Sequence, residues 1–248
     1  MGGDRLLPKN IIGIVSDFDD YYIGILTASL YSRLDDIFVV NLGRVREYNV
    51  LSSIFIILSS IEYFRKGSIF LSCVDPEPLT SDYIVCDYNG YYIIGPNNGV
   101  FSPFLDTGKF YFYNIDEIVL KKNTVEIISA ITVSFLRYLK PKPYDKEIKF
   151  INFKPKFYNS WIEGNVFFID SFGNVITNIP NNYFDEITSL FFNSIKIDKY
   201  FGFEEVKEIG VIKGSQGFLE IVANKKSAKD LLKIEVSNTI KGVFGGRK

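Results

Sequence analysis

Apolar residues in the first part of the chain form short runs that alternate with longer segments of helical periodicity. The short runs predict buried strands at residues 11–15, 37–42, 68–74, 83–87 and 91–94, and the longer segments predict helices at 22–33, 49–65 and 124–139. Strands that alternate with helices are typical of an α/β layer with a mostly parallel sheet.

The pattern changes after the third predicted helix. Two prolines among charged residues at 140–147 cannot continue that helix, so we place a linker at 144–158, between an α/β domain (1–143) and a second domain (159–248). The second domain contains only strand-like runs, at 161–170, 175–179, 190–197, 209–213, 218–223 and 232–237. This half is expected to be all-β, as a small barrel or sandwich.

Composition narrows the possible partners. The chain has 248 residues and a net charge of −1, without the basic excess that binds nucleic acid or anionic membranes. The longest apolar stretch, 50–64, is interrupted by serines and is too short to span a bilayer, and no secretion signal is visible. We therefore expect a cytoplasmic protein, with Cys73 and Cys86 as reduced core residues.

Histidine is absent from the chain. Nucleophilic mechanisms that use an imidazole base and the usual histidine-bearing zinc sites are therefore excluded. Two cysteines cannot complete a structural zinc site, and we expect no metal.

Polar residues follow several predicted strands of the first domain, where open α/β sheets collect their ligands. Asp17 lies after the first strand, and its carboxylate can accept hydrogen bonds from both hydroxyls of a ribose. Asp75 lies after the third strand, and Pro76 is expected to hold it in the extended region. The alternative is that these residues cap helices or close turns.

Asp170, Phe172 and Asn174 alternate within a turn between two strand-like runs. A carboxylate, an aromatic ring and an amide on one side of the backbone suit a nucleoside that carries a charged tail. The alternative is a hairpin in which Asp170 and Asn174 bond their own turn. Ser215 offers a hydroxyl and free amides for a carboxylate, or closes a hairpin that leads to Ser227 as a helix N-cap.

Together these motifs resemble the S-adenosyl-L-methionine (SAM) hydroxide adenosyltransferases, relatives of the fluorinases and chlorinases. The resemblance runs from about Ile11 to Ala228, and five segments carry it. These are Ser16-Asp17-Phe18 with Asp20 to Gly24, Val74-Asp75-Pro76, Pro96 to Gly99, Asp170 to Asn174 with Thr177-Asn178, and Ser215 to Glu220.

The resemblance implies an α/β domain followed by a C-terminal β-barrel, assembled as a homotrimer with SAM between neighbouring subunits. No separate cofactor is implied, because SAM is the substrate or ligand. Carried over by position, the resemblance implies that Asp17 binds the ribose diol. Phe172 would pack on the adenine face, and Asn174 would bond the adenine edge. Asp20 and Asp170 would bind the methionine ammonium, and Ser215 the methionine carboxylate.

The chain departs from the family around the attacking water. The resemblance implies an Asp, an Arg and a His there, but only Asp75 remains, Asp82 stands at the arginine position, and no histidine is present. One hypothesis is a divergent SAM hydrolase that forms adenosine and L-methionine with Asp75 as its catalytic residue. The other is a SAM- or adenosine-binding protein that has lost catalysis.

Overall fold

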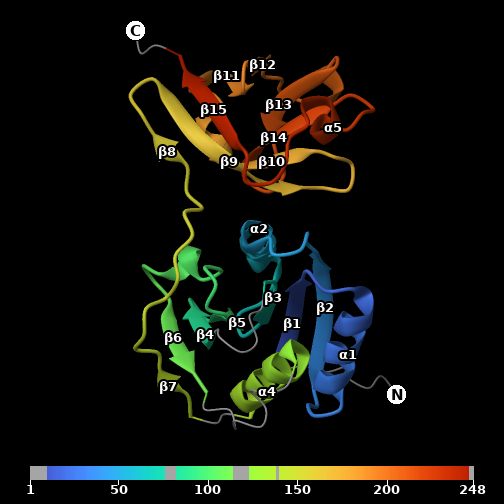
Figure 1. The fold of residues 1–248 in the computed structure, drawn as a ribbon, viewed down its shortest axis with the longest axis vertical. Coiled ribbons are helices and arrows are strands. Elements are labelled where there is room, and N and C mark those ends of the chain that lie inside the picture. Colours follow the sequence, from blue (N-terminus) through green and yellow to red (C-terminus); the bar gives the residue numbers. More distant parts are fainter. Residues whose placement is uncertain (1–9, 76–81, 114–122, 138–139, 246–248) are drawn as a thin grey trace, which may run out of the picture. The chain divides into compact units, whose positions relative to one another are not determined.

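The computed structural model describes residues 10–75, 82–113, 123–137 and 140–245. These residues form two compact units, which divide the chain at Ile151 and Asn152 (Figure 1). Pro76 and the following residues to 81 lie outside the described part, as does the end of the predicted helix 124–139.

The first unit contains a mixed seven-stranded sheet in the order β2-β1-β3-β5-β4-β6-β7. Neighbours are parallel from β2 to β5 and antiparallel from β5 to β7. The strands are β1 (Asn10–Ser16), β2 (Ile37–Arg44), β3 (Ile69–Cys73), β4 (Tyr83–Tyr88), β5 (Tyr91–Pro96), β6 (Lys109–Phe112) and β7 (Lys142–Pro143). The expected mostly parallel half is confirmed, and β6 and β7 extend it in the antiparallel sense.

Three described α-helices cover this sheet: α1 (Asp20–Tyr31), α2 (Val50–Ser60) and α4 (Thr124–Leu136). The side chains of Asn49 and Asn123 cap α2 and α4 by accepting main-chain N–H groups three residues ahead. Helices α1 and α4 lie side by side and share one apolar core with the sheet, and Ser29 contacts Ser129 across them at 2.9 Å. Helix α2 contacts the sheet through a pair of buried hydroxyls, Ser53 and Ser72, 3.0 Å apart.

The second unit is an antiparallel sheet that curls into a nearly closed barrel (Figure 1). Its order is β12-β11-β15-β9-β10-β14-β13, with β8 paired to β9. A bridge between Lys199 and Val211 brings the two ends of this order together. The strands are β8 (Lys156–Phe157), β9 (Trp161–Ile169), β10 (Val175–Pro180), β11 (Ile187–Phe192), β12 (Ile195–Ile197), β13 (Ile209–Lys213), β14 (Phe218–Ala223) and β15 (Thr239–Phe244).

Two strand predictions in this unit are wrong. The run 190–197 is divided into β11 and β12 by a tight turn with Asn193 at φ 53°. The run 232–237 contains no strand: Ser227 caps the short helix α5 (Ala228–Leu232), and Lys233 ends it in the left-handed conformation at φ 52°. The last strand therefore begins only at Thr239. Leu232 belongs to the capped helix, and the left-handed turn at Lys233 prevents the chain from continuing as a strand.

The first part of the expected linker forms hydrogen bonds with the first unit. Lys149 N–H donates to Asn97 Oδ1 at 2.8 Å, and Ile151 N–H donates to Ser102 Oγ at 2.8 Å. Cys73 and Cys86 are free and buried, as expected. Within the described ranges, the helices are too short or too polar to cross a membrane.

Candidate functional site

Asp17 follows β1 and is buried, with 9% of its surface exposed. Its Oδ2 accepts the main-chain N–H groups of Tyr48 and Asp75, both at 3.0 Å. Its Oδ1 is buried and has no hydrogen-bond partner among the described residues. Buried carboxylate oxygens are normally satisfied, so this atom is the clearest candidate in the cluster for accepting a hydrogen bond from a ligand.

Asp75 lies at the end of β3, within the same hydrogen-bonded cluster as Asp17. Asn98 holds this turn, because its Nδ2 donates to the carbonyls of Val74 at 2.8 Å and Asp75 at 3.2 Å. The expectation that Asp75 is extended is wrong: its φ of 45° is left-handed. A non-glycine residue pays about 1–3 kcal/mol for such a conformation, and residues held in this way cluster at functional sites.

Asp20 is the first residue of α1, next to the N-cap Asp19, and it is exposed. Asp19 forms an ion pair with Arg44 at 2.8 Å. Asp20, the other carboxylate at this end of the helix, has no ion pair among the described residues. A carboxylate in the first turn is stabilised by the helix dipole.

Asp82 stands where the resemblance implies an arginine, and it belongs to a separate network. Its Oδ2 accepts from the Tyr144 hydroxyl at 2.9 Å and from Lys146 Nζ at 2.9 Å. Burial and the bond to Asp82 raise the pKa of Tyr144 to about 12, so the tyrosine donates to Asp82 as a neutral phenol. Asp82 therefore fixes the segment around Tyr144, and this position carries a carboxylate where the resemblance implies an arginine.

The turn between β9 and β10 is organised by Asp170. Its Oδ1 accepts the main-chain N–H groups of Phe172 and Asn174 at 2.9 Å each, and its Oδ2 accepts Asn174 Nδ2 at 3.0 Å. The hairpin alternative for this segment is thus seen in the structure. It does not exclude binding, because the same bonds fix the main chain at Phe172 and the carboxamide of Asn174.

Gly173 joins this turn to the start of α5. Its φ is +81°, and a Cβ atom built there would lie 2.2 Å from Ser227 Oγ. The Gly173 carbonyl also accepts the N–H of Lys229 at 2.9 Å. Ser227 caps α5 by accepting from Asp230 N–H at 3.0 Å, as the turn alternative for this segment predicted. Glycine is therefore required because the turn packs directly on the helix cap.

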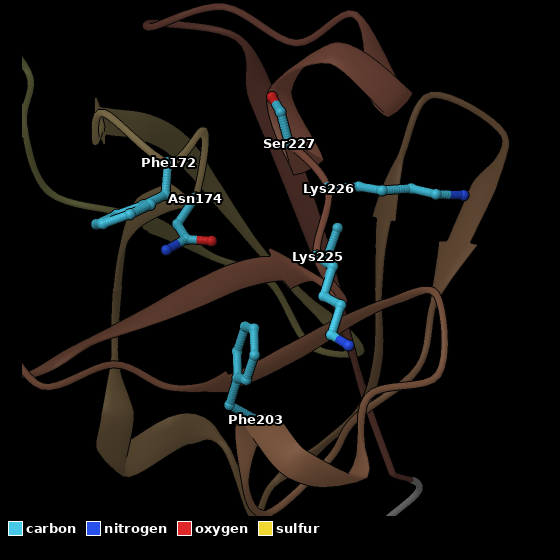
Figure 2. Close-up of a pocket in the computed structure, with 7 residues that line it drawn as sticks. Phe172, Asn174, Phe203, Lys225, Lys226 and Ser227 are labelled. Atoms are coloured by element: carbon cyan, nitrogen blue, oxygen red, sulfur yellow. The ribbon is translucent and has the colours of Figure 1, made fainter.

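A pocket of about 670 Å³ lies between this turn and the β14–α5 loop (Figure 2). Phe172 and Asn174 lie on one side of it, Phe203 lies below them in the view, and Lys225 is opposite. Phe172 is 78% exposed. The lining residues are Phe172, Asn174, Phe203, Ala223, Lys225, Lys226 and Ser227.

Ser215 is exposed in the turn between β13 and β14 and is not among these lining residues. Asn181 holds that turn, donating from its main-chain N–H to Gly217 and from Nδ2 to Gly214. On β14, burial raises the pKa of Glu220, and the charge of Asp170 adds to this effect.

The structure brings five of the seven predicted residues together as two groups, and Asp20 and Ser215 are in neither. Asp17 and Asp75 share one hydrogen-bonded cluster in the first unit, and Asp170, Phe172 and Asn174 share one turn in the second. Sequence reasoning missed Tyr48, Asn98, Phe203 and Lys225. Asn98 lay inside a quoted motif, but no local pattern marks Phe203 or Lys225, which reach the pocket only through the closure of the barrel.

Both groups contain carboxylates, and the second adds an aromatic ring and an amide. Family models of the SAM hydroxide adenosyltransferase N-terminal and C-terminal domains match residues 12–130 and 164–241, so the chain belongs to this family.

One curated relative and two solved structures are similar to nearly the whole chain. It is similar to the (R)-S-adenosyl-L-methionine hydrolase of Methanocaldococcus jannaschii, at 23% identity over 95% of this chain and 96% of the relative. The fold resembles an uncharacterized conserved protein from Thermotoga maritima (TM-score 0.80, 22% identity, 94% of this chain and 99% of that one). It also resembles a conserved hypothetical protein from Thermus thermophilus (TM-score 0.76, 19% identity, 94% and 100%).

Proposed function

We propose that this protein hydrolyses SAM to adenosine and L-methionine. The observation that carries the proposal is the Asp17–Asp75 cluster, in which a buried carboxylate keeps one unpartnered oxygen and holds the main chain of a second, strained aspartate. Membership of the family and the hydrolase name of the archaeal relative support turnover over binding alone.

In the proposed reaction a water oxygen attacks C5′ of the adenosyl group. The new C5′–O bond forms as the C5′–S bond breaks, and the sulfur takes the electron pair to give neutral L-methionine. The water loses one proton to the Asp75 carboxylate, which releases it to solvent afterwards. Positioned acid–base catalysis contributes about 10²–10⁴-fold in rate, and the sulfonium leaving group needs no general acid.

Recognition is assigned to the remaining residues. Asp17 Oδ1 accepts from the ribose diol, while Oδ2 keeps the Tyr48 and Asp75 amides. Phe172 stacks on adenine, and Asn174 bonds its edge. Around the methionine, the ammonium is assigned to Asp20 and Asp170, and the carboxylate to Ser215.

We also propose a homotrimer in which neighbouring subunits complete each site. The exposed face of α1 supports association, because it carries no charge beyond the first turn. This face consists of Tyr21, Gly24, Ile25, Ala28 and Tyr31, all exposed. Contiguous exposed apolar patches mark interaction sites when they are large.

Product chromatography tests the reaction. The protein is incubated with each sulfonium epimer of SAM, alongside Asp75→Asn and an Asp35→Asn control on the exposed segment after α1. We expect the wild type and the control to form adenosine and L-methionine in equal amounts, and Asp75→Asn to lose at least about a hundredfold in rate. Equal rates for all three proteins would remove Asp75 from the mechanism, and absence of product from the wild type would refute the hydrolase proposal.

A further inference from the structure

Lys225 is a cation at the pocket without an ion pair among the described residues. It lies in the loop between β14 and α5, is exposed, and adopts a left-handed φ of 53°. The next residue, Lys226, differs: its ammonium pairs with Glu208 at 3.9 Å and points away from Phe172 and Asn174 (Figure 2). The two adjacent lysines therefore have different surroundings.

Asn174 presents an acceptor to the same pocket. Its Nδ2 donates to Asp170 Oδ2 at 3.0 Å, which fixes the orientation of the carboxamide. Its oxygen has no recorded partner among the described residues and lies on the side of the carboxamide toward Lys225 in Figure 2. The pocket thus combines one acceptor and one charged donor with the aromatic rings of Phe172 and Phe203.

This arrangement complements adenine among the purines. Adenine carries an amino donor at N6 beside an acceptor nitrogen, either N7 or N1, whereas guanine presents acceptors at both O6 and N7. A lysine alone would favour guanine, because it can donate to both O6 and N7. The Asn174 oxygen would then face O6, and two acceptors would repel each other. We propose that Lys225 determines base specificity, donating to a ring nitrogen of adenine while Asn174 Oδ1 accepts from the N6 amino group.

The inference rests on the adenosine moiety of the proposed substrate, and calorimetric titration of the full-length protein with adenosine tests it. A hydrogen bond to a charged group contributes about 1.5–3 kcal/mol, so Lys225→Met should raise the Kd of adenosine by about tenfold or more. Lys226→Met should change it by less than about twofold, because an exposed ion pair contributes little. Lys225→Arg, which keeps a charged donor, should restore most of the affinity.

Titration with base analogues identifies the bond itself. If Lys225 donates to N7, 7-deazaadenosine binds the wild type about tenfold more weakly than adenosine does, but binds Lys225→Met as adenosine does. If it donates to N1, 1-deazaadenosine gives that pattern, and either result supports the proposal. Equal losses in the wild type and in Lys225→Met for both analogues would overturn it.

Other outcomes separate this inference from the proposed function. A wild type that hydrolyses SAM, with unchanged adenosine affinity in Lys225→Met, would overturn the role of Lys225 alone. A wild type that neither binds adenosine at millimolar concentration nor forms product would refute the proposed function and this inference together.

Discussion

The two oxygens of Asp17 have different environments, and this difference makes the residue testable. Oδ2 satisfies two main-chain amides, while Oδ1 is buried without a partner among the described residues. A buried oxygen without a hydrogen-bond partner lowers the free energy of unfolding by about 1–3 kcal/mol. Such a cost is expected where the oxygen serves binding. The ribose diol of the proposed substrate would supply a hydrogen bond to this oxygen.

Asp17→Asn should therefore weaken the binding of adenosine far more than it weakens the binding of 2′-deoxyadenosine. The amide oxygen can still accept from Tyr48 and Asp75, so the turn is retained, but the charged acceptor for the diol is lost. We expect adenosine affinity to fall by roughly 10- to 100-fold, measured by calorimetry. Equal losses for both nucleosides would show that Asp17 acts on the fold and not on the ribose.

At the scale of elements, the β9–β10 turn depends on its contact with α5. Gly173→Ala would place a methyl group against Ser227 in a backbone conformation with φ +81°. The matched control is Gly217→Ala, where φ is +84° but no atom lies within 4 Å of the new Cβ. Backbone strain is common to both variants, and only Gly173→Ala adds a clash.

We expect Gly217→Ala to cost about 1 kcal/mol in the free energy of unfolding and Gly173→Ala about 2–4 kcal/mol. Urea denaturation followed by the fluorescence of Trp161, in the barrel unit, measures both. Similar costs in the two variants would show that the turn and the helix cap move apart readily, and the pocket would then not be preformed.

The buried sheet of the first unit should lose stability in alkali. Burial, together with the smaller effect of the Asp87 charge, raises the pKa of the Cys86 thiol from 9.0 to about 12, and burial also raises the pKa of Cys73. Because the folded state keeps these protons while the unfolded chain loses them above about pH 9, the stability that they provide is complete below that pH and declines as pH rises toward about 12.

Each thiol should remove about 1.4 kcal/mol from the free energy of unfolding between about pH 8 and pH 10. Cys86→Ala should therefore have a smaller pH dependence than the wild type by that amount, whatever the variant costs at the lower pH. Urea denaturation followed by circular dichroism at both pH values gives the comparison. Identical pH dependence in the two proteins would contradict the assignment to Cys86.

Sequence patterns predicted most elements because their signals are local. The strands β1 to β5 and the Asn49 cap of α2 follow from apolar runs and capping residues within a few positions. The β11–β12 turn was missed because apolar residues lie close on both sides of Asn193-Ser194. The start of α5 at Ser227 was one of the stated alternatives, but its end was misread as a strand, and the left-handed residues Asn193 and Lys233 are not glycines. In the site, Lys225 was beyond prediction because it reaches the pocket only once β14 pairs with β10.

At the scale of the whole molecule, the proposed trimer predicts that inactive variants rescue each other. Asp75→Asn damages the group in the first unit, and Phe172→Ala damages the group in the second. If neighbouring subunits complete each site, refolding the two variants together should restore roughly a quarter of the wild-type activity, because randomly paired subunits combine the two intact halves at that frequency.

Each variant refolded alone should remain inactive, and Phe201→Ala, which removes another exposed ring of the barrel unit, should remain active. Light scattering should give three chains per particle. A monomer, or a mixture as inactive as its components, would contradict a site shared between subunits.

The central claim is that water attacks C5′ of SAM, and hydrolysis in ¹⁸O-labelled water tests it most directly. Mass spectrometry of the products should show one labelled oxygen in adenosine, at the 5′ position, and none in L-methionine beyond exchange. Unlabelled adenosine, or SAM recovered intact from the wild type, would contradict the claim.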